Sequence, residues 1–129
     1  MTLPSRRAQL IALTVELVAV ATLAGFGPEF PRDVSSGSAW RFLGQHALEA
    51  AHSGLGVLVL LQALVLLIAH RGWGSLVIAA GVATATAAGT TYVSAGQTDA
   101  SLTAMTLGWL VALVAAVVGL IRGRPRRGQ

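Results

Sequence analysis

The sequence predicts an all-α integral membrane protein, a four-helix bundle that forms one domain over residues 1–129. Composition is the first reason, because 54% of the 129 residues are hydrophobic and 11% are charged, whereas about a quarter of the residues in a soluble domain are charged. The second reason is the presence of four apolar stretches with the roughly 20 residues that a helix needs to cross a bilayer. A soluble enzyme of ordinary composition is therefore excluded.

Four stretches are predicted to span the membrane as helices, over residues 8–26, 45–69, 74–94 and 102–121. The first connection, residues 27–44, contains Pro28, Pro31 and a stretch rich in serine and glycine, so we expect a loop at or beyond the membrane surface. The second connection, residues 70–73, is short and is expected to form a tight turn.

The arginines predict how the spans are oriented. Seven of the nine are expected on one side of the membrane, namely Arg6, Arg7, Arg71, Arg122, Arg124, Arg126 and Arg127. Only Arg32 and Arg41 are expected on the other side. The positive-inside rule then places both termini in the cytoplasm and the loops 27–44 and 95–101 outside, across what we expect to be a bacterial plasma membrane.

The basic character of the chain follows from this topology. The sequence pI is near 11.5, but the arginines lie in short clusters beside apolar segments, where anionic lipid headgroups are the available counter-charge and no nucleic acid partner is expected. Trp40, Trp73 and Tyr92 fall near the predicted interfaces, where aromatic residues are enriched. The chain has no cysteine, which excludes disulfides and thiolate chemistry.

The first apolar stretch has an alternative interpretation. Ser5-Arg6-Arg7 and the residues after it could be a twin-arginine export signal, whose removal would leave three spans. The length of the apolar run, the presence of Glu16 and the lack of an Ala-x-Ala cleavage site favour a membrane span.

The third and fourth spans carry small residues at helical spacing. In the third span these are Gly81, Ala85 and Gly89, and in the fourth they are Gly108, Ala112 and Ala116. Small side chains let helix backbones approach closely. We therefore expect these two spans to pack tightly on each other or across the interface of a homo-oligomer.

Glu16 is a polar residue that a membrane span should not tolerate without a reason. It lies near the middle of the first span, where a carboxylate costs about 2.5–3.5 kcal/mol on insertion scales. It must be neutral, paired or hydrated. Either it relays protons or binds a substrate, or it only forms a hydrogen bond with a neighbouring helix.

The second span opens with three ionisable residues, His46, Glu49 and His52, whose spacing of three places them on one broad helical face. Glu49 lies one turn from His52, where it could orient the imidazole or act on a bound group. Gly54 and Gly56 leave room for a flat ligand beside the helix. His52 could instead only bond to another helix, and His46 is expected nearer the interface.

Met105 enters the fourth span from the same side as His52 enters the second, so the two side chains could face each other. A methionine inside a helical bundle most often fills the core. Histidine and methionine are also a known pair of axial ligands for haem iron.

The order of these features resembles one half of the haem A synthase family, in which each half is a repeat of four helices. In that family a Glu-x-x-His-Arg motif opens the second helix of the first half, and a second histidine opens the fourth helix. Glu49-x-x-His52 matches this motif, and the resemblance covers about residues 45–118. Ser53 stands in place of the arginine, Met105 stands near the position of the second histidine, and the cysteine pair of many members is absent.

The resemblance implies a protein that binds haem b and transfers electrons or modifies haem in the outer leaflet. His52 would be one axial ligand, Met105 or His46 the second, and Glu49 would lie beside the haem. An enzyme of this type would be an oxidoreductase similar to haem A synthase, with Glu49 near the oxidised methyl group. The architecture of the family also implies a homodimer, and a quinone or respiratory-chain protein as partner.

A non-enzymatic function is the alternative. A small membrane protein could use Glu16, Glu49 and His52 as a path for protons or cations. It could equally be an accessory subunit in which these polar residues only contribute to packing.

Overall fold

The computed structural model describes residues 4–123 and is all-helical in this part of the chain. Its five helices are α1 (Arg6–Phe26), α2 (Ser36–Gln45), α3 (Ala47–Ala69), α4 (Trp73–Ser94) and α5 (Asp99–Arg122). The four predicted spans correspond to α1, α3, α4 and α5, and each predicted end lies within three residues of the observed one. Arg124, Arg126 and Arg127, which contributed to the predicted topology, lie outside the described residues.

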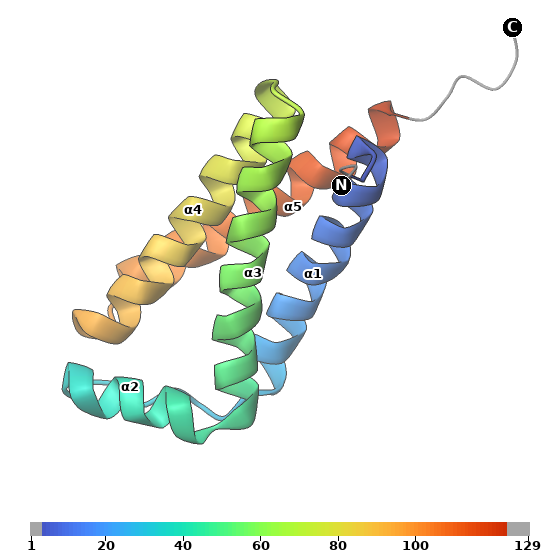
Figure 1. Ribbon diagram of the computed structural model, residues 1–129. Coiled ribbons are helices and arrows are strands. Elements are labelled where there is room, and N and C mark those ends of the chain that lie inside the picture. The colour runs from blue at the N-terminus through green and yellow to red at the C-terminus, as the bar shows by residue number, and fades with distance from the viewer. Residues whose placement is uncertain (1–3, 124–129) are drawn as a thin grey trace, which may run out of the picture.

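The four long helices are arranged so that each packs against two others (Figure 1). Helix α1 packs against α3 and α5, and α4 packs against the same two helices from the other side of the bundle. The first turn of α1, the last turn of α5 and the turn between α3 and α4 lie at one end of the bundle, which we call the terminal end (Figure 1). Helix α2 lies across the opposite end, the α2 end.

The four long helices are long and apolar enough to cross a membrane. Most of their large apolar side chains point away from the bundle, including Val15, which is 63% exposed, and Ile68, which is 71% exposed. Exposing apolar surface of this kind to water costs a free energy of about 25 cal/mol per Å². A bilayer accepts them, so the apolar exterior agrees with an integral membrane protein.

The most closely packed helix pair is α4 and α5. These helices contact each other through the small residues that were predicted to allow close packing. A Cβ atom added to Gly81 would lie 2.7 Å from the backbone oxygen of Gly108 and 2.9 Å from the backbone nitrogen of Ala112. A Cβ atom on Gly108 would lie 2.6 Å from the oxygen of Gly81. The predicted packing of the third and fourth spans on each other is confirmed.

The core runs through the middle of the bundle and receives side chains from every long helix. Leu13 of α1, Leu66 of α3 and Ala112 of α5 are completely buried, and Ile78 of α4 is 1% exposed. Because these side chains are fixed on rigid helices, the polar groups between them are held in defined positions as well.

Residues 36–45 form a helix, so the prediction of an irregular loop over the whole of 27–44 was wrong for its second half. The hydroxyl oxygen of Ser35 accepts a hydrogen bond from the backbone N–H of Ser38 at 3.3 Å, which caps the first turn of α2. The buried Ala39 fixes the inner face of this short helix. Serine and glycine are weak helix formers, so this helix was not expected from the sequence. Its cap and its packing on α3 and α4 stabilise it.

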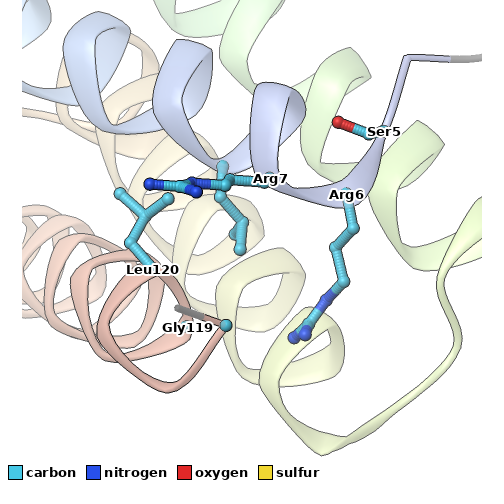
Figure 2. A pocket seen from close by; sticks show the side chains of 7 residues that line it. Ser5, Arg6, Arg7, Gly119 and Leu120 are labelled. Atoms are coloured by element: carbon cyan, nitrogen blue, oxygen red, sulfur yellow. The ribbon is translucent and has the colours of Figure 1, made fainter. Parts of the chain in front are cut away.

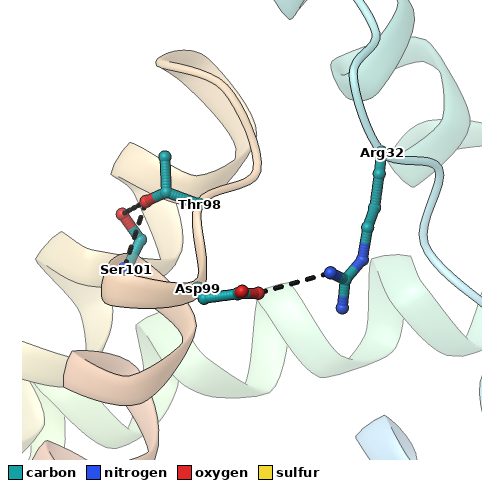
Figure 3. Close-up of polar contacts among 4 residues, drawn as sticks. All are labelled: Arg32, Thr98, Asp99 and Ser101. Carbon is teal, nitrogen blue, oxygen red and sulfur yellow. Dashed lines mark hydrogen bonds and ion pairs between the residues drawn. The ribbon is translucent and has the colours of Figure 1, made fainter.

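Polar contacts join the first connection to the turn between α4 and α5 at the α2 end. Arg32 donates to Asp99 at 3.3 Å, an exposed pair shown in Figure 3 beside the cap of α5, in which Thr98 accepts from the N–H of Ser101. The backbone N–H of Val34 donates to Oε1 of the buried Gln97 at 3.2 Å. An exposed ion pair contributes little, so the buried amide of Gln97 is the stronger of these ties.

Candidate functional site in the helical bundle

Glu16 of α1 is paired with Gln62 of α3 near the middle of the bundle. With the amide of Gln62 oriented so that both groups are satisfied, its nitrogen donates to the two carboxylate oxygens of Glu16 at 3.0 and 2.8 Å. Both side chains are half-buried. The carboxyl group predicted to need a partner therefore has one, and that partner is an amide rather than a cation.

His52 of α3 is fixed by the backbone of α1. Its Nδ1 donates to the carbonyl oxygen of Val20 at 2.9 Å. A carbonyl oxygen can only accept, so Nδ1 carries a proton, and Nε2 is the ring nitrogen left to act as a ligand. The imidazole is thus held in the tautomer in which Nε2 can bind a metal or accept a proton.

A third bond reaches the same part of α1 from α5. The indole Nε1–H of Trp109 donates to the carbonyl oxygen of Leu17 at 2.8 Å. Residues 16–20 of α1 therefore receive side-chain hydrogen bonds from Gln62, His52 and Trp109. We call these three side chains, together with Glu16, the polar centre.

The structure places Glu49 and His46 at the α2 end of the bundle, away from the part of α1 that His52 contacts. The carboxyl group of Glu49 lies against Gly27, at the C-terminal end of α1. Among the described residues no hydrogen bond joins Glu49 to His52, so the carbonyl of Val20 orients the imidazole instead.

His46 precedes α3 and has extended backbone angles, so it does not continue the helical face of His52. Its Nδ1 donates to the carbonyl oxygen of Phe42 at 2.8 Å, and its ring stacks on Phe42 with a centroid separation of 3.9 Å. Phe42 in turn contacts Phe30, which contacts Tyr92 of α4. His46 is therefore part of an aromatic cluster at the α2 end of the bundle.

Met105 of α5 packs against α4, because a Cβ atom on Gly89 would lie 3.2 Å from its sulfur. His52 contacts α1, so the two proposed axial ligands make their contacts with different helices. No cluster of three His, Cys, Asp or Glu side chains suited to a metal ion is found within residues 4–123.

His52 has a supporting hydrogen bond and open space nearby on its own helix. Its Nδ1–H bonds to a carbonyl oxygen, which is the usual support of a metal-binding histidine. One turn further along α3, a Cβ atom on Gly56 would meet no atom within 4 Å, so that face of the helix has open space. These two features leave room for a flat ligand beside α3.

Two members of the polar centre, Gln62 and Trp109, were not among the site residues predicted from the sequence. Gln62 is an isolated amide in the apolar 45–69 stretch, and Trp109 carries one N–H in the apolar 102–121 stretch. A buried amide or indole N–H needs a hydrogen-bond partner. Each was therefore a detectable signal of a contact between helices, although the partner depends on how the helices are registered.

The fold and the polar centre define the class of this protein as an all-helical bundle with four helices long and apolar enough to cross a membrane and with ionisable groups between them. Comparison of the chain with protein-family models, with curated proteins and with solved structures finds no match. The resemblance to the haem A synthase family stays a prediction.

Proposed function

We propose that this protein binds haem b in the half of the membrane nearer α2, with His52 as an axial ligand, and that it carries electrons or modifies haem there. The observation that carries the proposal is the 2.9 Å bond from Nδ1 of His52 to the carbonyl of Val20. This bond leaves Nε2 as the free ligand atom and fixes the ring, as the supporting groups of metal-binding histidines do.

The remaining residues have defined parts in this proposal. Met105 or His46 is the second ligand, and both lie toward the same end of the bundle as His52. A haem group supplies one-electron chemistry when bound. The chain would hold the imidazole through the carbonyl of Val20 and offer the carboxyl group of Glu49 as the acid on the same helix.

Absorbance of the purified full-length chain tests the proposal. The wild-type protein from haem-replete cells, or after addition of hemin, should show a Soret band. His52→Ala should remove this band. Val20 is not substituted, because its contribution is a backbone carbonyl that a change of side chain does not remove. His70→Ala is the matched control, since His70 lies at the terminal end, and it should leave the spectrum unchanged.

Two results would overturn haem binding at this site. One is a wild-type protein that stays colourless in isolated membranes and after hemin addition. The other is a His52→Ala protein with a normal Soret band, which would place any haem elsewhere.

A second candidate function is proton binding in the membrane interior, and the pairing of Glu16 with Gln62 favours it. The amide nitrogen of Gln62 can donate to an ionised carboxylate, and after rotation its oxygen can accept from a carboxylic acid. The pair thus satisfies both protonation states without moving a helix. Proton flux into vesicles that contain the protein should fall in Glu16→Gln and persist in Glu29→Gln, whose carboxyl lies outside the spans. Equal flux with and without the protein would exclude this function.

A further inference from the structure

The terminal end of the bundle contains a cavity that the haem proposal does not use. It has a volume of about 320 Å³ and lies between the first turn of α1 and the last turns of α5 (Figure 2). Arg6 and Arg7 line it from α1, and Leu10, Gly119 and Leu120 form its apolar wall. Ligand pockets in proteins begin at about this size.

The charge of this end has no counterpart in the acidic side chains of the chain. Among the five carboxylate residues, Glu29, Asp33, Glu49 and Asp99 belong to the α2 end, and Glu16 is paired in the middle. The ion pair found within residues 4–123 is the one between Arg32 and Asp99, at the other end. Any acidic partner for Arg6 and Arg7 is therefore not one of the Asp or Glu side chains of residues 4–123.

The helix ends around the cavity do not decide its charge. The N-terminus of α1 contributes about half a positive charge and the C-terminus of α5 about half a negative charge, so these contributions nearly cancel. The two guanidinium groups therefore dominate. Figure 2 shows Arg7 extended toward Leu120. Arg6 extends toward the start of α4, where its terminal nitrogen lies 3.4 Å from the Cβ position of Gly74.

The absence of a side chain at Gly119 keeps the apolar part of the cavity open. A Cβ atom at this position would lie 3.1 Å from Cδ1 of Leu10, on the opposite wall. The pocket is thus lined by cationic groups from the first turn of α1 and by aliphatic side chains, Leu10 and Leu120. This combination suits an amphiphile with an anionic head and a hydrocarbon chain better than it suits a free anion.

We propose that the cavity between α1 and α5 binds one anionic phospholipid, with its phosphate at Arg6 and Arg7 and an acyl chain along Leu10 and Leu120. Basic pockets between membrane helices are known to hold anionic headgroups. Guanidinium groups suit this role because they bind phosphate oxygens in a bidentate manner. The proposal is independent of haem, since the cavity and the polar centre lie on different parts of α1.

Native mass spectrometry of the full-length protein in detergent tests this site. Phosphatidylglycerol should bind at least tenfold more tightly than phosphatidylcholine, with one tight site per chain. The double variant Arg6→Gln/Arg7→Gln should lose this preference. Arg71→Gln removes one positive charge at the same end of the bundle but outside the cavity, and it should keep affinity within twofold of wild type.

Variants that fill the cavity separate a built site from general attraction to charge. Gly119→Leu keeps every arginine and should weaken phosphatidylglycerol binding at least fivefold. If Gly119→Leu does not fold, Leu120→Trp is the substitute. Leu120 is half-buried and also lines the cavity, so a larger side chain there should fill the same space and have the same effect. Wild-type affinity in a folded filling variant would overturn the proposal.

The source of the phosphate is tested with inorganic phosphate as the competitor. Millimolar inorganic phosphate should leave the bound phosphatidylglycerol in place, because it gains nothing from the apolar wall. Displacement of the lipid by phosphate alone would identify a free-anion site and contradict the lipid proposal. Retained lipid preference in Arg6→Gln/Arg7→Gln would contradict it as well.

Discussion

Gly81 of α4 and Gly108 of α5 face each other so closely that a Cβ atom on either would fall 2.6–2.7 Å from the backbone oxygen of the other. A protein accepts such a separation only where both residues lack a side chain. The contact fixes α4 and α5 relative to each other. Ala112 lies against Gly81 and Ala85 lies against Gly108, so the close approach extends along both helices and makes α4 and α5 the most closely packed pair of the bundle.

Gly108→Ala should therefore destabilise the bundle. The added methyl group meets backbone atoms, which cannot rotate away, so the helices must separate, at a cost of about 1–3 kcal/mol for overpacking. Gly25→Ala is the matched control, because a Cβ atom there meets nothing within 4 Å. Thermal unfolding in detergent measures the difference. A melting temperature for Gly108→Ala equal to that of the control would show that the interface is looser than described.

Glu16 and Gln62 should show strong energetic coupling. Gln62→Leu leaves the carboxyl group without its amide, and it should lower stability by about 1–3 kcal/mol. Glu16→Leu in the same background should restore most of this loss, because no polar group then remains unpaired. A double-mutant cycle of unfolding free energies measures the coupling, and additive effects would contradict the pairing.

Met105→Leu should change the haem spectrum without removing the Soret band, if Met105 is the second ligand. It should also lower the reduction potential, because a methionine ligand raises it. His46→Ala should have these effects instead if His46 is the ligand. Spectroelectrochemistry of both variants distinguishes the two, and unchanged spectra in both would assign the second position to neither residue.

The absence of cysteine allows the topology to be tested with single introduced thiols. Ser36→Cys, at the start of α2, should react with a membrane-impermeant maleimide in intact cells. Arg71→Cys, in the turn between α3 and α4, should react only after the membrane is opened. The reverse pattern would place both termini outside and would contradict the positive-inside assignment.

The spans could be predicted closely because hydrophobic length and small-residue spacing are local properties of the sequence. The Gly81 and Gly108 faces needed only helical periodicity to be recognised, and of the two expected partners, each other or a second copy, the structure shows the first. Helix α2 could not be predicted in the same way. Its residues are poor helix formers, and its stability depends on Ala39 and its neighbours packing across the end of the bundle.

Two residues of the candidate site were predictable from the sequence, but their hydrogen-bond partners were not. Glu16 and His52 were recognisable because ionisable groups are rare inside membrane spans. Their partners, Gln62 and the carbonyl of Val20, depend on the register of α3 against α1, which no local pattern encodes. Glu49 was expected to orient the imidazole of His52. The backbone carbonyl of Val20 on α1 does so instead.

The pairing of Glu16 with Gln62 also has a consequence for biosynthesis. Ribosomes add about 5–20 residues per second, so α1 reaches the translocon seconds before Gln62 of α3 is synthesised. The insertion machinery must therefore accept Glu16 without its amide, against a cost of about 2.5–3.5 kcal/mol. The leucines, valines and isoleucine around it must supply the opposing free energy alone. Residues on the lipid-facing side of α1 are thus constrained by a transient stage of synthesis as well as by the finished bundle.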